Sequence, residues 1–440
     1  MIRMKRVLIV VSSFPPSMLA DGHRARMLCR ELPETGWIPE VLSPHPIYYR
    51  EDTIEQDAVG SIPKELVIHY SGVEPDCLRR LFGNRFKQWR TLILLYFKGR
   101  RVLDSNRFDT VYFSTTSFAL FVLGRLWALE TGVNYILDFH DPWFHRERQA
   151  RSGATLKTAL SSMVSHALER FSVPRASGLV VVSEAYAEMY ANRYTNAFGN
   201  GSAKKKIQCV PFAASQSDFD YLDTHRWTND VFDPEDGALH VIYVGAGGAI
   251  MKKGFESLCS TISSLRSQGH SAAGRLRIHL LGTMYGWRDA DPKTLELIAA
   301  ELGLEGLVIE DPRRVPYFKA LHFATAAHGL LVLGVDDPGY FPSKLFTYGF
   351  TGKPLLAVLH EDSPALRHFE GPDSLGYCLR FGSDGASSFV DDQDPVARFL
   401  TAVERNDTSP RTSAQFEKYL APAMARRHAE FFQSCLRESN

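Results

Sequence analysis

Residues 335–358, VDDPGYFPSKLFTYGFTGKPLLAV, place a lysine at a predicted helix start directly before a buried strand. Pro342 and Ser343 are typical of residues that begin a helix, and Lys344 follows in its first turn. The apolar run Pro354 to Val358 then reads as a strand. Free backbone N–H groups at a helix start, with a lysine beside them, attract anions. The stretch predicts either a phosphate site or an amphipathic helix with a solvated lysine, a common feature of α/β proteins.

Short apolar runs of strand character recur along the chain, separated by amphipathic segments of helix length. Unbroken apolar strands that alternate with helices are typical of parallel sheets covered on both faces. The pattern predicts an α/β protein with two doubly wound domains. The predicted strands are Val7–Val11, Pro39–Leu42, Leu66–Tyr70, Thr110–Ser114, Tyr135–Asp138, Gly178–Val182, Ile207–Pro211, His240–Gly245, Leu276–Leu281, Leu307–Ile309, Gly329–Leu333, Pro354–Val358 and Tyr377–Arg380.

The length of 440 residues suits two domains of about 200 residues each. We expect the first at residues 1–212 and the second at 239–412. Residues 213–238 are polar, acidic and poor in periodicity, which predicts a linker. Residues 413–440 carry an apolar stripe at helical spacing, so this segment is expected to form a helix that Pro422 kinks or splits. That helix either caps the second domain or crosses back to the first.

Charge and cysteine content limit the classes of protein. The net charge is zero, but residues 1–210 hold 28 Lys and Arg against 20 Asp and Glu, a net +8, and residues 211–440 hold 22 against 30, a net −8. Six scattered cysteines lack a CxxC pair or histidines at zinc spacing, which predicts reduced thiols of a cytosolic protein. No apolar run reaches the roughly 18 residues that span a bilayer, and Val7–Val11 is too short for a signal sequence.

Residues 77–103, CLRRLFGNRFKQWRTLILLYFKGRRVL, combine eight basic residues with large apolar ones and contain no acidic residue. This pattern suits a helix lying in an anionic membrane surface. A partly buried helix with solvated arginines is the alternative. Nucleic acid is not expected as a partner, because the second half of the chain is acidic and no nucleic-acid-binding motif occurs.

Loops that follow strands are the places where ligands bind in this architecture. The first, SSFPPSMLADGHRARML, carries Gly22 just before a helix, so its backbone can approach an anion; a long loop with a helix cap at Asp21 is the alternative. In the second domain, HVIYVGAGGAIMKKGFESL places Gly247 after a strand and Lys253 at a helix start, a pattern that suits a diphosphate. It matches the dinucleotide fingerprint only partly, because Ile250 replaces the third glycine.

A third loop, in YILDFHDPWFHRERQ, places Asp138, His140 and Asp141 at the end of an apolar strand. Charged residues at such a position are candidates for a catalytic or polar contact. The alternative is that one carboxylate caps the next helix and that His140 is a hydrogen-bonded residue in the wall of the cleft. The side chains of this loop do not have the spacing of a known metal-binding motif, so no metal site is expected.

Taken in order, three segments resemble the glycosyltransferase family 4 group of GT-B-fold glycosyltransferases. VLIVVSSFPP followed by DGHRARMLCREL resembles the family's start, where a glycine loop faces the donor. YVGAGGAIMKKGFESL resembles the start of the family's second domain, whose lysine, matching Lys253, binds donor phosphate. PSKLFTYGFTGKPLLAV resembles the version PSKLxEYxAxGKPVLA, whose lysine, matching Lys344, lies at the same diphosphate.

The chain also departs from this family. Two glutamates usually present around the helix would fall at Gly339 and Thr347. Asp336 and Asp337 lie close to the first position and are candidate substitutes, and Thr347 keeps a hydroxyl for a ribose. An arginine often found after the first strand of the second domain is replaced by small residues, Ala246–Ala249.

The resemblance implies a GT-B fold, in which two Rossmann-like domains face a central cleft, and a hexosyltransferase that closes both domains over a nucleotide-diphosphate sugar. It implies retention of anomeric configuration without a metal or other cofactor. The catalytic candidates are His140 and Asp141. The donor-binding candidates are Gly22, Gly247, Lys253, Ser343, Lys344 and Thr347.

The acceptor is expected to be a saccharide or a lipid-linked saccharide of cell-envelope polysaccharide or lipopolysaccharide assembly, because the basic segment lies in the first domain. The protein is then expected in the cytoplasm, on the inner face of the cell membrane. A GT-B-fold sugar-nucleotide epimerase and a non-catalytic sugar-nucleotide-binding relative are the alternatives.

Overall fold

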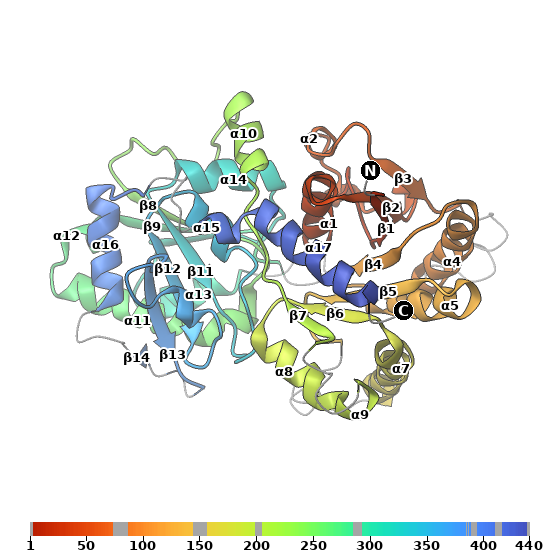
Figure 1. The fold of residues 1–440 in the computed structure, drawn as a ribbon. Helices are drawn as coiled ribbons and strands as arrows, with labels where there is room; N and C mark the ends of the chain where they lie inside the picture. Colours follow the sequence, from red (N-terminus) through yellow and green to blue (C-terminus); the bar gives the residue numbers. More distant parts are fainter. Residues whose placement is uncertain are drawn as a thin grey trace. The chain divides into compact units, whose positions relative to one another are not determined.

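The computed structural model describes residues 3–73, 87–143, 156–198, 205–284, 293–383, 385, 387–388, 394–409 and 416–437. The chain forms two compact units. Unit 1 comprises Met1–Pro211 and Ala421–Asn440, and unit 2 comprises Phe212–Leu420 (Figure 1). Each unit is built around a seven-stranded sheet, so the chain leaves unit 1 once and returns to it with its last helix.

All strands of the unit 1 sheet are parallel and lie in the order β3-β2-β1-β4-β5-β6-β7. The order reverses between β1 and β4, which makes this the topological switch point of a doubly wound sheet. The strands are β1 Lys5–Val10, β2 Trp37–Ser43, β3 Val67–Tyr70, β4 Thr110–Ser114, β5 Asn134–Phe139, β6 Gly178–Val181 and β7 Ile207–Cys209.

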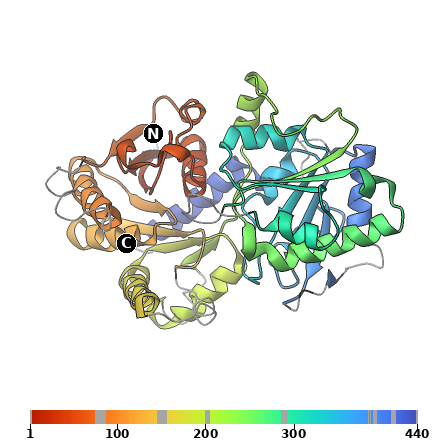
Figure 2. The same ribbon diagram turned by 180° about the vertical axis from the view of Figure 1, so that it is seen from behind.

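Helices cover both faces of this sheet, as Figures 1 and 2 show from opposite sides. Right-handed crossovers put α1 on one face and α4, α5 and α7 on the other, and α17 packs against α1. The helices of unit 1 are α1 Ala20–Glu31, α2 Asp57–Gly60, α4 Lys87–Ser105, α5 Phe121–Thr131, α7 Leu156–Ser172, α8 Glu184–Arg193, α9 Thr195–Phe198 and α17 Ala421–Arg437.

The unit 2 sheet has the order β10-β9-β8-β11-β12-β13-β14, in which only β14 is antiparallel to its neighbour. Its strands are β8 Leu239–Val244, β9 Leu276–Leu281, β10 Val308–Asp311, β11 Gly329–Leu333, β12 Leu355–His360, β13 Tyr377–Phe381 and β14 Ser387–Ser388. Its helices are α10 Gln216–Thr224, α11 Lys252–Ser267, α12 Ser271–Arg275, α13 Leu295–Glu301, α14 Tyr317–Ala326, α15 Leu345–Phe350 and α16 Pro395–Arg405.

The two doubly wound α/β sheets predicted from the apolar runs are confirmed, and each of the thirteen predicted strands overlaps an observed one. Every residue of β4, β8, β11 and β12 is buried. Strands that are buried along their whole length are apolar without alternation, because both faces of the sheet are covered by helices.

Two segments outside the sheets can be compared with their predicted roles. Residues 213–238, predicted as a linker, contain helix α10 and belong to unit 2, where Phe219 and Phe232 are buried in the core. The segment expected to be kinked or split at Pro422 is divided next to it: a 3-10 turn at Glu417–Tyr419 is followed by an extended Leu420, and α17 begins at Ala421. Pro422 is the second residue of α17, where a missing N–H costs no hydrogen bond.

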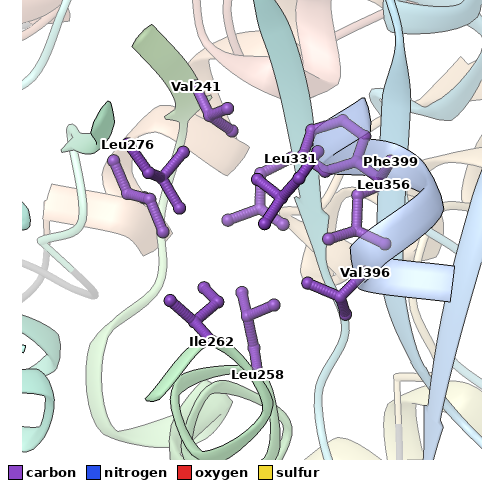
Figure 3. Close-up of a pocket in the computed structure, with 10 residues that line it drawn as sticks. Val241, Leu258, Ile262, Leu276, Leu331, Leu356, Val396 and Phe399 are labelled. Atoms are coloured by element: carbon purple, nitrogen blue, oxygen red, sulfur yellow. The ribbon is translucent and has the colours of Figure 1, made fainter. Parts of the chain in front are cut away.

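The core of unit 2 leaves one small apolar cavity between the sheet and helices α11 and α16 (Figure 3). Its volume is about 10 Å³, which is at the lower limit for one water molecule. All ten lining side chains are apolar, among them Leu258, Leu331 and Phe399, so the cavity offers no hydrogen bond to a water or a ligand. It is a packing gap and not a candidate site.

Candidate functional site

The loop after β8 folds back closely on itself because two glycines adopt backbone angles that other residues avoid. Gly245 has φ +146° and Gly248 has φ +79°. The N–H of Gly245 donates to the carbonyl of Leu281 at 2.8 Å, and the N–H of Gly247 donates to that of Thr283 at 3.1 Å. Both bonds join this loop to the end of the neighbouring strand, which fixes its course at the carboxyl edge of the sheet.

The side chain of Lys344 lies directly against this loop. A Cβ atom added to Gly245 would clash with the Nζ atom of Lys344. The ammonium group also lies over the ring of Tyr243, 5.6 Å from its centroid. Burial lowers the pKa of Lys344 to about 8. No carboxylate of the described residues forms an ion pair with Lys344, so an anion would be favoured beside its desolvated ammonium.

Helix α15 is shorter than the sequence pattern suggested. It begins at Leu345 and has six residues, with Lys344 at its N-cap, and the N–H of Leu345 already donates to Pro342 O at 3.3 Å. A helix of this length has a small dipole, so the attraction for an anion rests on the Lys344 ammonium. Ser343 is exposed beside it, and Thr347 is half-buried in the helix.

Lys253 is part of an ion pair. Its Nζ atom donates to Asp336 Oδ2 at 2.7 Å and to the carbonyl of Ser383 at 2.6 Å, and the lysine side chain is 40% exposed. His360 Nε2 lies 3.1 Å from the hydroxyl of Ser383 and 3.9 Å from Asp336 Oδ1. Lys253, Asp336, His360 and Ser383 thus form one polar group where strands β11, β12 and β13 end.

The two aspartates that could replace the missing glutamate have different roles. Asp336 holds Lys253, as described above. Asp337 Oδ1 accepts the N–H of Gly339 at 2.9 Å, which stabilises the loop between β11 and α15. Asp336 is therefore the carboxylate that lies next to a donor-binding candidate.

In unit 1, the carboxylate of Asp138 is the centre of a buried polar cluster. Its Oδ2 atom accepts hydrogen bonds from Tyr112 Oη at 2.7 Å, His140 Nε2 at 2.8 Å and Ser114 Oγ at 3.2 Å. Arg24 Nε lies 3.4 Å from the same oxygen. Asp138 and Arg24 are almost fully buried, so the pair is screened very little by solvent.

Helix α17 contributes to the cluster through His428. Its Nδ1 donates to Met424 O at 2.8 Å, so Nε2 carries the lone pair, 3.0 Å from the hydroxyl of Tyr112. Arg24 also donates to the carbonyl oxygen of Val210 at 2.8 Å, just before the chain leaves unit 1 for unit 2. The cluster therefore joins the helix after β1, two central strands and the last helix of the chain.

Burial and charge determine the protonation of this cluster. Burial by itself raises the pKa of Asp138, but Arg24 and His140 outweigh it and hold that pKa well below its usual range. Burial, with Arg24 nearby, lowers the pKa of His428 to about 4. At neutral pH the cluster thus holds an ionised Asp138 and a neutral His428, and His140 is oriented by the carboxylate.

The structure places the remaining candidates of unit 1 as follows. His140 is buried and bonded to Asp138, whereas Asp141 is exposed. Gly22 lies in the first turn of α1, whose N-cap is Leu19. Asp21 does not cap that helix; it accepts hydrogen bonds from Ser12 and Ser13, which ties the preceding loop to the helix. A side chain at position 22 would crowd the carbonyl of Ser13.

Sequence reasoning singled out Lys344, Lys253, His140, Asp138 and Asp336, but it missed Ser114, His360, Tyr112 and His428. Ser114 and His360 end buried strands, so polar residues closing an apolar run were a usable signal. No sequence signal marked Tyr112 and His428, because they lie 316 residues apart and each fits an ordinary apolar pattern.

Within the described ranges, no group of three or more His, Cys, Asp or Glu side chains is arranged to hold a metal ion. In the same part of the chain, no helix has the length and apolar character needed to cross a bilayer. Cys29, Cys209, Cys259, Cys378 and Cys435 are free thiols.

Comparisons with known proteins agree with this architecture. Residues 22–197 match the family model of the glycosyl transferase 4-like domain. No curated protein sequence matches the chain.

Solved structures match nearly the whole chain at low identity. HepE of Anabaena, solved in complex with UDP and glucose, is 14% identical with a TM-score of 0.57, covering 98% of this chain and 100% of HepE. Sucrose-phosphate synthase of Thermosynechococcus elongatus is 14% identical, with a TM-score of 0.55 and coverage of 99% and 94%. A putative UDP-N-acetylglucosamine 2-epimerase of Listeria monocytogenes is 11% identical, with a TM-score of 0.51 and coverage of 99% and 97%. Residues 22–197 therefore match the glycosyl transferase 4-like domain, and the chain as a whole has the GT-B fold.

Proposed function

We propose that this protein is a hexosyltransferase that moves a sugar from a nucleoside-diphosphate sugar to a hydroxyl group of an acceptor. The bond between the sugar C1 and the diphosphate oxygen breaks, and a bond between C1 and the acceptor oxygen forms. The nucleoside diphosphate leaves, and the proton of the acceptor hydroxyl is released with it. The family of residues 22–197 and the UDP found in HepE support this choice of reaction and donor.

The arrangement of Lys344 is the observation that carries the proposal. Its ammonium is desolvated, lies on the backbone of Gly245 and has no ion-pair partner in the described part of the chain. A buried charge without a counter-ion costs free energy, and an arriving diphosphate removes that cost. The same group stabilises the charge that develops on the diphosphate as the C1–O bond breaks.

We further propose that the reaction retains the anomeric configuration and uses no metal. Lys253 and Lys344 supply the positive charge that a divalent cation supplies in metal-dependent enzymes. On binding, the diphosphate competes with Asp336 for Lys253. We assign His140 and Asp141 to contacts with sugar or acceptor hydroxyls, since Asp138 fixes the ring of His140 and Asp141 is open to solvent.

For the acceptor we propose a saccharide or lipid-linked saccharide of cell-envelope polysaccharide or lipopolysaccharide assembly, made on the cytoplasmic side of the membrane. The basic and apolar character of α4 supports this choice. Gly22, Gly247, Ser343 and Thr347 remain donor-binding candidates. Ser343 and Thr347 lie beside Lys344, and Gly247 lies in the loop that Lys344 contacts.

Thermal-shift screening with UDP, GDP and ADP sugars tests the proposal, because a ligand that binds only the folded state raises the melting temperature. We expect one nucleotide to stabilise the wild type and to lose its effect in Lys344→Ala. Lys252→Ala is the control, because Lys252 is a solvent-exposed lysine at the start of α11 that pairs with Glu256 at the surface. Equal stabilisation of wild type and Lys344→Ala would refute the donor site.

A turnover assay with the stabilising sugar nucleotide then separates the three functions. Transfer to an acceptor, with release of nucleoside diphosphate, supports the proposal. Conversion of the free sugar nucleotide without acceptor identifies an epimerase instead. Binding with neither transfer nor conversion identifies a non-catalytic relative, which the absence of carboxylates at Gly339 and Thr347 would explain.

A further inference from the structure

Helices α4, α5 and α7 of unit 1 expose a band of large apolar side chains. Helix α5 contacts both α4 and α7 (Figure 1). Among the described residues, eight of the seventeen exposed large apolar side chains lie on these three helices, so exposure is concentrated here and not scattered. The eight residues are Trp89, Ile93 and Phe97 on α4, Leu129 on α5, and Leu160, Met163, Val164 and Phe171 on α7.

On α4 these residues form one stripe. Trp89, Ile93 and Phe97 follow each other at intervals of four and are 43%, 52% and 57% exposed. Residues four apart lie on the same side of a helix. Arg101, also exposed, continues the stripe by one further step of four. The band is thus apolar along most of α4 and basic at its end.

On α7, Met163 and Val164 lie three and four residues after Leu160, and Phe171 lies seven residues after Val164. Leu160 is 63% exposed and Met163 is 69% exposed, the highest values among the eight, and Val164 lies next to them. Leu129 of α5, which is 60% exposed, belongs to the helix between α4 and α7. The band therefore extends over neighbouring helices and is not a property of α4 alone.

Packing prevents α4 from rotating to bury its stripe. Its other side is anchored by Leu95 and Val102, which are buried. Gly99 lies so close to the ring of Trp127 that a Cβ atom would clash with it, and Trp127 Nε1 donates to Tyr96 O at 3.3 Å. The apolar stripe is thus held toward the outside by a close helix–helix contact.

The same three helices are positively charged. Together they hold eight Lys and Arg residues against three Asp and Glu residues, a net +5, whereas the whole chain has a net charge of zero. Among the described side chains of these helices that are not buried, five are basic and two are acidic, so the apolar band adjoins surface charge of net +3.

We propose that the apolar band on α4, α5 and α7 docks on an anionic lipid surface. Large apolar side chains enter the boundary between headgroups and acyl chains, and basic residues bind the anionic headgroups. A second copy of the chain fits less well, because a two-fold dimer would bring two surfaces of the same positive charge together. This proposal goes beyond the proposed function, since docking requires neither donor nor acceptor.

Vesicle co-sedimentation of the full-length protein tests this surface. We compare vesicles of phosphatidylcholine alone with vesicles that contain about 30% phosphatidylglycerol, at low and high salt. We expect binding to the anionic vesicles, and we expect high salt to weaken it. Binding to both vesicle types with equal affinity, or to neither, would overturn the proposal.

Variants then locate the surface. Ile93→Ser with Phe97→Ser on α4, and separately Met163→Ser on α7, should each lower binding by about tenfold or more, because the apolar contacts are lost. Leu297→Ser is the matched control, since Leu297 is 59% exposed on α13 of unit 2. Unchanged binding in both test variants, or an equal loss in the control, contradicts the assignment.

Two further measurements keep the result clear. Nucleotide-induced thermal shifts of the variants show that they fold, and they are independent of the lipid. Light scattering after size exclusion measures the mass in solution: a dimer that the serine variants dissociate, together with no preference for anionic vesicles, would assign the band to a second copy and overturn the membrane proposal.

Discussion

The ammonium of Lys344 occupies the space that a side chain at position 245 would need. Gly245 therefore has two functions in the structure. It adopts φ +146°, which other residues rarely adopt, and its missing Cβ leaves room for the lysine against the backbone. The glycine and the lysine lie about a hundred residues apart, yet the position of one depends on the other.

Gly245→Ala should displace Lys344 and weaken binding of the nucleoside diphosphate by about tenfold or more, which calorimetry can measure. Strain at this backbone angle also lowers stability, by on the order of 1–3 kcal/mol. Gly274→Ala is the control, because a Cβ there meets nothing. If the proposed contact is real, adding Gly245→Ala to Lys344→Ala weakens binding little further; fully additive losses would argue against it.

Loss of the Lys344 charge should lower turnover by about 10² to 10³, as for the loss of one preorganised group that stabilises a transition state. The comparison is kcat/KM of Lys344→Ala and of the Lys252→Ala control with the stabilising sugar nucleotide. Full activity in Lys344→Ala would mean that the diphosphate binds elsewhere.

The lowered pKa of Lys344 predicts a pH dependence of binding. With a pKa of about 8 in the free protein, the lysine is mostly charged at pH 7 and mostly neutral at pH 9. A bound diphosphate favours the charged form, so binding above pH 8 should take up a proton and become weaker as pH rises. Calorimetry in buffers of different ionisation enthalpy measures this uptake, which should be absent in Lys344→Ala.

Asp336→Asn should strengthen binding of the free nucleoside diphosphate by a few fold. The substitution removes the carboxylate that pairs with Lys253 at 2.7 Å and that competes with phosphate for its charge. Weaker binding in this variant would show instead that Asp336 is needed to position Lys253.

The buried ion pair of unit 1 predicts a large effect on stability. Asp138→Asn leaves Arg24 buried without a countercharge, which should cost about 3–5 kcal/mol in urea unfolding. Asp52→Asn is the control. It removes a similar pair with Arg50, but both side chains are more than a third exposed, so a change of at most about 1 kcal/mol is expected. Similar losses in both variants would contradict this account of the Asp138 cluster.

Buried histidines should make the protein less stable in mild acid. Burial lowers the pKa of His279 and of His428 to about 4, against 6.5 in the unfolded chain. Between pH 6.5 and 4 the unfolded state therefore binds more protons, and the free energy of unfolding falls as pH falls. The full contribution, on the order of 3 kcal/mol for each residue, is present above pH 6.5. His279→Gln should flatten the dependence measured by urea unfolding, and an unchanged slope would contradict it.

Local patterns in the sequence predicted the sheets and part of the site. Buried parallel strands such as Gly329–Leu333 are apolar throughout, so their bounds could be read directly. Lys344 and Lys253 became candidates because a lysine near a glycine loop is a local pattern, and their donor-binding role stays a prediction. The helix predicted to begin at Pro342 and Ser343 begins at Leu345 instead, because residues before Leu345 are held by loop contacts that no propensity encodes.

Partners from distant parts of the chain were beyond the sequence. The pairing of Lys253 with Asp336 and of Tyr112 with His428 depends on which strands lie side by side. The exposed side of α7 also went unnoticed. Leu160 and Met163 have the spacing of a core-facing stripe, and only the packing of the helix shows that they point to solvent.

Helix α17 follows unit 2 in the chain but belongs to unit 1, most of which is synthesised before unit 2. Unit 2 is continuous in sequence and can fold as soon as Leu420 has left the ribosome. Unit 1 must wait for His428 and its neighbours before the polar group around Asp138 is complete. A premature stop codon between Ala421 and His428 would therefore damage unit 1 and leave unit 2 intact.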